Sequence, residues 1–107
     1  MVEEITATEL KSRMDAGEDV QLIDVRQPDE YAFTRIEGAK LIPMGEILSR
    51  MNELDTAREA IIQCKMGRRS ASVIEALTQA GYKGPLKNLK GGITAWSNEV
   101  DSKVPKY

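Results

Sequence analysis

The stretch "AIIQCKMGRRSASVIEAL" (residues 60–77) decides the fold, because its pattern predicts a strand, a tight turn and a helix in immediate succession. The apolar run 60–64 is typical of a strand buried inside a sheet. After the turn, Val73, Ile74 and Leu77 keep the spacing of one helix face. A strand followed at once by a helix is the unit from which α/β domains are built, so we expect that class of fold.

The rest of the chain continues this alternation of strand and helix patterns. Short apolar runs predict further strands over 20–25, 39–43, 86–89 and, at an edge, 3–5. Helical patterns fall over 7–15, 28–33, 47–54 and 92–100. The first of these helices is marked by a capping box, Thr6 with Glu9. The aromatic side chains of Tyr31, Phe33 and Trp96 are expected to anchor the core, because aromatic residues bury large areas. The pattern as a whole predicts a mostly parallel sheet.

Composition excludes several classes of protein. The 107 residues suffice for one domain with a single core. Fifteen Lys and Arg against seventeen Asp and Glu give a net charge of −2, which argues against a nucleic-acid surface. No apolar run approaches the ~18 residues that a membrane span needs, so we expect no membrane partner. The acidic, polar opening "MVEEITATEL" does not resemble a signal peptide.

The cysteine and histidine counts narrow the chemistry further. Cys64 is the single cysteine of the chain, so an internal disulfide is impossible, and a cytoplasmic location fits. The chain contains no histidine. A Cys-His or Ser-His nucleophile pair is therefore excluded, and so is nearly every common zinc site.

Cys64 itself falls where α/β proteins place their functional sites. It closes a predicted buried strand, and ligands bind at the carboxyl ends of strands in open α/β sheets. Gly67 permits a tight loop whose backbone N–H groups turn inward to form an anion-binding nest. Lys65, Arg68 and Arg69 add positive charge beside the start of the next helix. These features favour a thiolate, so we predict that the pKa of Cys64 is lowered.

An ordinary buried cysteine beside a solvated basic helix start is the alternative explanation of this stretch. Helix starts normally favour Asp and Glu, because the helix dipole is positive there. Three cations at such a position oppose that preference, and local rules are usually broken at functional sites. The pattern therefore favours a functional cysteine.

The same residues resemble those of a known family. "CKMGRRS" (64–70) is similar to the active-site loop of rhodanese-type sulfurtransferases, whose pattern is Cys-x-x-Gly-x-Arg followed by a small hydroxyl residue. "LIDVRQPDEY" (22–31), "IEGAKLIP" (36–43) and "LKGGITAW" (89–96) resemble three further motifs of that family, in the same order. The resemblance implies one rhodanese-like domain over 1–107, with its core at about 5–100 and a five-stranded, mostly parallel sheet that carries helices on both faces.

The ending of the chain resembles the rhodanese domain that terminates molybdopterin synthase sulfurylases. An adenylating domain precedes it in those proteins, and the 107 residues contain none, so the chain is either an excised domain or a stand-alone relative. The family usually has a histidine where this chain has Arg35. Since the cysteine does the chemistry in this family, we treat that difference as structural.

The resemblance also implies a mechanism and its partners. Cys64 would carry sulfane sulfur as a persulfide and pass it to a thiophilic acceptor or a sulfur-carrier protein. The donor would be thiosulfate or the persulfide of a cysteine desulfurase, and neither a metal nor an organic cofactor would be required. In relatives, an ion pair at the positions of Asp24 and Arg26 supports the active-site loop. The loop that binds the substrate would consist of Lys65, Met66, Gly67, Arg68, Arg69 and Ser70. Of its cations, Arg69 occupies the family's arginine position, so it is expected to matter most for sulfur uptake.

Two other functions are alternatives to sulfur transfer. Cysteine phosphatases of the cell-cycle and arsenate-reductase kinds use a larger loop, Cys-x5-Arg, because a tetrahedral oxyanion needs more room than one sulfur. Here the sixth position after Cys64 is Ser70, and the arginine falls at the fifth, so the spacing favours sulfur. Non-catalytic rhodanese-like binding modules typically lose the cysteine, whereas this chain keeps it.

Overall fold

The computed structural model describes residues 2–107 and has strands and helices in alternation. The strands are β1 (Glu4–Ile5), β2 (Gln21–Asp24), β3 (Lys40–Leu41), β4 (Ala60–Gln63) and β5 (Leu86–Leu89). The helices are α1 (Ala7–Asp15), α2 (Pro28–Phe33), α3 (Arg68–Gln79) and α4 (Gly92–Glu99). The capping box of Thr6 and Glu9 opens α1 as predicted.

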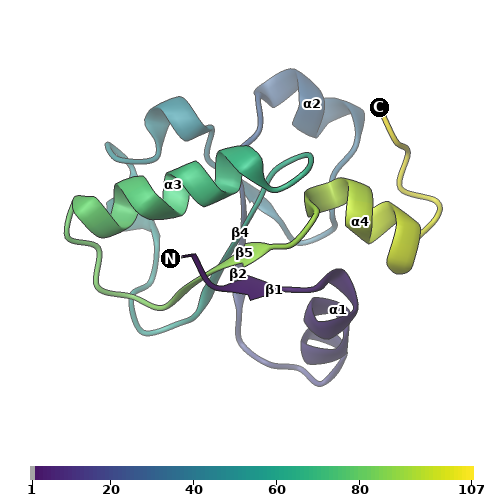
Figure 1. The fold of residues 1–107 in the computed structure, drawn as a ribbon, viewed down its shortest axis with the longest axis horizontal. Helices are drawn as coiled ribbons and strands as arrows, with labels where there is room; N and C mark the ends of the chain where they lie inside the picture. The colour runs from purple at the N-terminus through teal and green to yellow at the C-terminus, as the bar shows by residue number, and fades with distance from the viewer. Residues whose placement is uncertain (1) are drawn as a thin grey trace.

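All five strands pair in parallel, in the order β1-β5-β4-β2-β3. Figure 1 shows α3 and α1 on opposite sides of this sheet. The central strand β4 is buried on both faces, which is why its sequence is apolar without alternation. The α/β class with a five-stranded parallel sheet is therefore confirmed. The edge strand predicted over 3–5 is β1, and the strand predicted over 39–43 is β3, a two-residue strand at the opposite edge.

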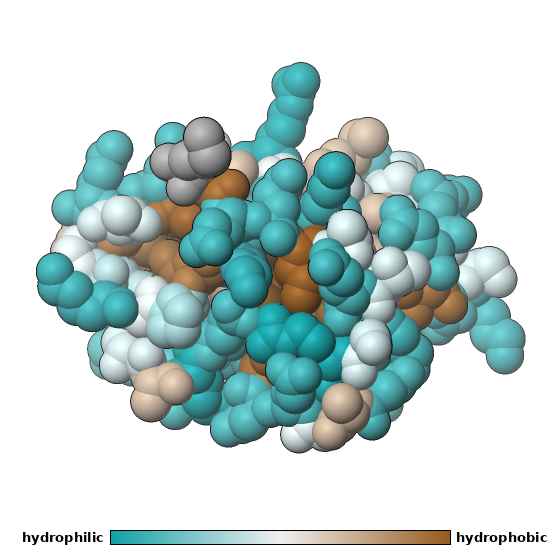
Figure 2. Space-filling model, turned by 60° about the horizontal axis from the view of Figure 1, so that its bottom comes forward, coloured by the Kyte–Doolittle hydropathy of each residue, from teal (hydrophilic) through white to brown (hydrophobic). Residues whose placement is uncertain are grey.

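The two faces of the sheet have separate apolar cores. On one face, α3 contributes Val73, Ile74 and Leu77 to a core that also contains Cys64. On the other face, α1 and α4 pack together, and Trp96 of α4 lies in the core there with 6% of its surface exposed. Hydrophilic side chains cover most of the face drawn in Figure 2, with hydrophobic atoms visible between them.

The helix predicted over 47–54 was wrong. Two short 3₁₀ turns, η1 (Met44–Glu46) and η2 (Met51–Glu53), lie in this part of the chain. Arg50 leaves the helical region at φ −117° and ψ 11°, which separates the two turns. The apolar residues of this segment still contribute to the core, because Ile47 and Leu54 are both buried there.

The expectation for Phe33 was also wrong. Its side chain is 60% exposed, because α2 is only six residues long and none of its residues is buried. Phe33 instead contacts the ring of Tyr107 edge-on, with 6.0 Å between centroids. Tyr31 on the same helix is half-buried, packs against the core, and donates a hydrogen bond to the carbonyl of Ala39 at 2.8 Å.

Candidate active site

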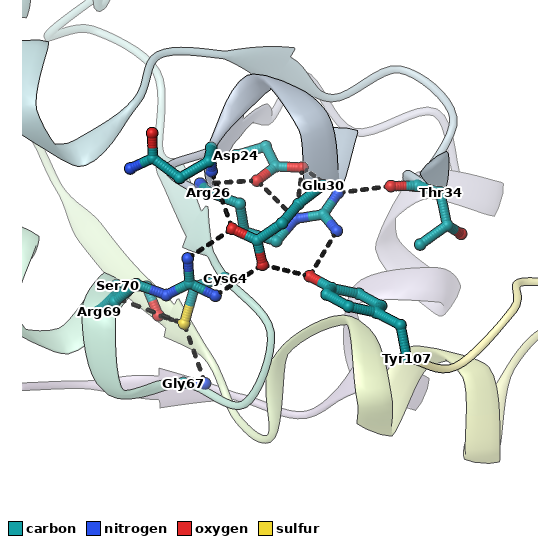
Figure 3. Close-up of polar contacts among 10 residues, drawn as sticks. Asp24, Arg26, Glu30, Thr34, Cys64, Gly67, Arg69, Ser70 and Tyr107 are labelled. Atoms are coloured by element: carbon teal, nitrogen blue, oxygen red, sulfur yellow. Dashed lines mark hydrogen bonds and ion pairs between the residues drawn. The ribbon is translucent and has the colours of Figure 1, made fainter. Parts of the chain in front are cut away.

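Cys64 lies at the end of β4, in a loop that folds around its sulfur. The backbone N–H of Gly67 donates to Sγ at 3.1 Å, and the N–H of Ser70 donates to it at 3.4 Å (Figure 3). The Ser70 hydroxyl is 3.3 Å from the same sulfur. Gly67 has φ +100°, the left-handed conformation that glycine adopts without strain, and α3 begins at the next residue. The predicted nest is therefore present, with Cys64 as its occupant.

The carbonyl groups of the loop point the other way, toward α4. Ile93 N–H donates to the carbonyl of Cys64 at 2.9 Å, and Thr94 N–H donates to that of Lys65 at 3.1 Å. Gly92, at φ +58°, makes this approach possible, because a Cβ there would lie 2.4 Å from the Cys64 carbonyl oxygen. With the carbonyls held by α4, the loop N–H groups are left to face the sulfur.

These contacts decide the ionisation of the thiol. Burial of Cys64, which is 1% exposed, opposes the charged form. Hydrogen bonds from the Ser70 hydroxyl and from the backbone N–H groups of Ser70, Gly67 and Met66 outweigh burial and lower the pKa of Cys64. The predicted direction is therefore confirmed. The sequence interpretation credited the backbone N–H groups, the helix start and the cationic side chains together. The groups that lower the pKa here are the Ser70 hydroxyl and the backbone amides.

The three loop cations have different surroundings. Arg69 forms a bidentate ion pair with Glu30 of α2, which is 39 residues earlier in the chain. This hydrogen-bonded pair raises the pKa of Arg69, and the negative charge of ionised Cys64 adds to the effect. Lys65 places its ammonium group 4.6 Å from the ring centroid of Tyr107. Arg68 and Met66 are exposed, and Met66 has 63% of its surface accessible.

Asp24 and Arg26 form the ion pair that the family resemblance implied, and both side chains are fully buried. The Arg26 guanidinium also donates to the carbonyl of Thr34 and to the hydroxyl of Tyr107. Tyr107 in turn donates to Glu30 at 2.6 Å. Burial and that bond to Glu30 raise the pKa of Tyr107, which keeps its hydroxyl protonated. The pair thus reaches Arg69 through Tyr107 and Glu30 (Figure 3).

Sequence reasoning missed three residues of this site. No sequence pattern gave Glu30 or Tyr107 a role in the site. Asn88, on β5, donates to the carbonyl of Gly67 at 3.0 Å and accepts a short hydrogen bond from Ser70. A polar residue inside the apolar run "LKNL" was the available signal for Asn88. Arg35, the departure from the family pattern, lies over the Tyr31 ring at 4.8 Å.

The described residues carry no sign of a metal site or a membrane span. Within 2–107, no group of three or more Cys, Asp or Glu side chains is placed to hold a metal ion. The helices in that same range are all too short or too polar to cross a bilayer.

Comparison with known proteins agrees with this geometry. A "Sulfurtransferase" of Allochromatium vinosum is 42% identical over 97 residues, which cover 91% of this chain and 90% of that protein. The "Probable adenylyltransferase/sulfurtransferase MoeZ" of Mycobacterium tuberculosis is 38% identical over 105 residues. That match covers 96% of this chain but only 26% of MoeZ, so the chain spans about a quarter of the length of this relative.

A solved structure and a family match complete the comparison. The rhodanese-like domain protein of Staphylococcus aureus superimposes with a TM-score of 0.83 at 35% identity, and the superposition covers 99% of both chains.

 The protein SSP1007 of Staphylococcus saprophyticus superimposes with a TM-score of 0.82, also at 35% identity, over 92% of this chain and 97% of that one. The rhodanese-like domain family matches residues 6–99. The chain therefore belongs to the rhodanese-like domain family.

Proposed function

We propose that this protein is a sulfurtransferase that carries sulfane sulfur as a persulfide on Cys64. The observation that carries the proposal is the nest around Sγ, in which the N–H groups of Gly67 and Ser70 point at the sulfur. Preorganised donors of this kind stabilise a negative charge without reorganising during the reaction. The sulfurtransferase names of two relatives, in A. vinosum and M. tuberculosis, support the same function.

The reaction consists of two displacements at sulfur. The Cys64 thiolate attacks the outer sulfur of the donor, forming a new S–S bond while the donor's own S–S bond breaks. The bonding electron pair leaves with the donor, as sulfite when the donor is thiosulfate. A nucleophilic acceptor then attacks the terminal sulfur of the persulfide, and Cys64 departs as a thiolate. The loop amides face the negative charge that is present on sulfur before and after each step.

The cations serve to attract an anionic donor. Lys65 and Arg68 form no ion pair with the residues in the range 2–107, so their charges are available at the loop. The guanidinium of Arg69 is paired with Glu30, and the negative charge of ionised Cys64 also raises the pKa of Arg69. We propose that thiosulfate or a protein persulfide is the sulfur donor. The proposed acceptor is a thiophile or a sulfur-carrier protein, and an adenylating domain is a further proposed partner.

Sulfur uptake and release can be measured separately. Intact-mass spectrometry after incubation with thiosulfate should show the addition of one sulfur atom to the wild-type protein. Cyanide should then remove that atom and release thiocyanate. Cys64→Ser should show neither step, whereas Ser72→Ala, on the exposed side of α3, should show both. Absence of the adduct with thiosulfate and with a protein persulfide would contradict the proposal, and so would Cys64-dependent hydrolysis of aryl phosphates.

A further inference from the structure

The hydroxyl of Ser70 lies between two partners but has one proton to give. Its Oγ is 3.3 Å from Cys64 Sγ on one side and forms a short hydrogen bond with Asn88 Oδ1 on the other. Ser70 is fully buried, and Asn88 is 2% exposed. A hydroxyl donates one hydrogen bond, so Ser70 serves either the sulfur or the amide oxygen at any moment.

The orientation of Asn88 is fixed by its other contact. Its Nδ2 donates to the carbonyl of Gly67 at 3.0 Å. Rotating the amide would set Oδ1 against that carbonyl, with two acceptors facing each other. The amide oxygen therefore stays toward Ser70, where it can only accept. While Ser70 donates to Asn88, its lone pairs face the sulfur, and this arrangement suits a protonated thiol that donates S–H.

When the sulfur is ionised, Ser70 must donate its hydrogen bond to the sulfur instead of accepting one from it. A thiolate or a persulfide anion only accepts hydrogen bonds, so the Ser70 proton must turn toward Sγ. Asn88 Oδ1 then loses its donor inside the protein, which is unfavourable. We propose that Asn88 is a positioning residue that competes with Cys64 for the Ser70 hydroxyl proton and so sets how readily the sulfur ionises. This role deepens the proposed function and rests on it for its place in the reaction.

The charges around the loop remain the same in any Asn88 variant that adds no charge. They come from the loop and α3, from α2, and from the strands and their ends: Lys65, Arg68, Arg69, Glu30, Glu4, Asp24, Arg26 and Lys90. The tail adds the hydroxyl of Tyr107, which is titratable but stays protonated because its pKa is raised. Glu4 is the acid nearest to Asn88, at 3.5 Å from its Nδ2. A shift of the Cys64 pKa in an Asn88→Ala protein can therefore be assigned to the hydrogen bonds.

The test is the pH dependence of alkylation by iodoacetamide, which reports the thiolate without requiring sulfur transfer. Asn88→Ala should lower the apparent pKa of Cys64 by roughly half to one unit, the effect of one neutral hydrogen bond. Ser70→Ala should raise it. In the Ser70→Ala background, Asn88→Ala should produce no further downward shift, because the competing proton is gone. Asn98→Ala, an exposed asparagine on α4, is the matched control and should change nothing.

A purely structural role would give a different result. If Asn88 only held the loop through Gly67, its removal would shift the pKa equally with and without Ser70, and that outcome overturns the proposal. Should Asn88→Ala fail to fold, Asn88→Leu serves instead, since it fills a similar volume and removes the acceptor without adding a charge. It should lower the pKa of Cys64 when Ser70 is present and produce no further lowering when Ser70 is replaced by Ala. A wild-type protein that alkylates as described but forms no persulfide would contradict the proposed function alone.

Discussion

Arg69 and Glu30 face each other in a two-bond ion pair, with Nη1 2.7 Å from Oε1 and Nη2 2.9 Å from Oε2. This pair joins the start of α3 to the start of α2, and Tyr107 donates a third hydrogen bond to the same carboxylate. The ion pair therefore connects the loop of Cys64 to α2, the helix that follows β2.

The first prediction concerns the pH dependence of stability. The hydrogen bonds from Arg69 lower the pKa of Glu30 from 4.5 to about 2, against the opposing effect of burial. Because the native pKa is the lower one, the stabilisation is complete above pH 4.5 and is lost as pH falls toward 2. Wild type should lose about 1 to 2 kcal/mol more unfolding free energy than Glu30→Gln over that range, allowing for solvent screening of Arg69. Urea titrations at several pH values measure this, and parallel pH curves would contradict it.

A second prediction concerns the buried pair of Asp24 and Arg26. Arg26→Met leaves the Asp24 carboxylate buried without its partner, which typically costs about 3–5 kcal/mol. Asp24→Leu combined with Arg26→Met should recover part of that loss, because no charge remains buried. Lys11→Met, which removes one partner of an exposed pair on α1, should have little effect. Equal losses in the single and double variants would show that the charges are not the cause.

The third prediction concerns the contact between α4 and the loop. Gly92→Ala should destabilise the fold by more than about 2 kcal/mol, because its Cβ would collide with two carbonyl groups at a left-handed backbone position. The apparent pKa of Cys64 should rise as well, since the loop amides would be displaced. Gly45→Ala is the matched control, because no atom lies within 4 Å of its added Cβ. Denaturation and alkylation profiles of the two variants supply the comparison.

The fourth prediction concerns the loop cations. Arg69→Ala should reduce kcat/KM for thiosulfate roughly ten- to a hundredfold, the usual effect of losing a charge-assisted hydrogen bond. Lys65→Ala and Arg68→Ala should affect a protein persulfide donor more than thiosulfate. Lys11→Ala, an exposed cation on α1, controls for net charge. Equal and negligible effects on both donors would indicate that the backbone of the loop suffices.

The sequence predicted the parts of this site that are local in the chain. The strand, the turn at Gly67 and the helix after it follow one another within 60–77, so periodicity and glycine placement were enough. The contacts of Asn88 and Glu30 with the loop join residues 21 and 39 positions apart, and no local pattern encodes them. The prediction that Phe33 lies in the core was wrong for a related reason. The sequence of a short helix does not show which residues from elsewhere in the chain cover its hydrophobic side chain.

The hydrogen bonds from Ile93 and Thr94 to the loop carbonyls have a consequence for how the protein is made. A ribosome delivers Cys64 well before it delivers α4, and the loop lacks those two donors in the interval. We therefore expect Cys64 to react as an ordinary thiol until α4 docks and holds the carbonyl groups of the loop.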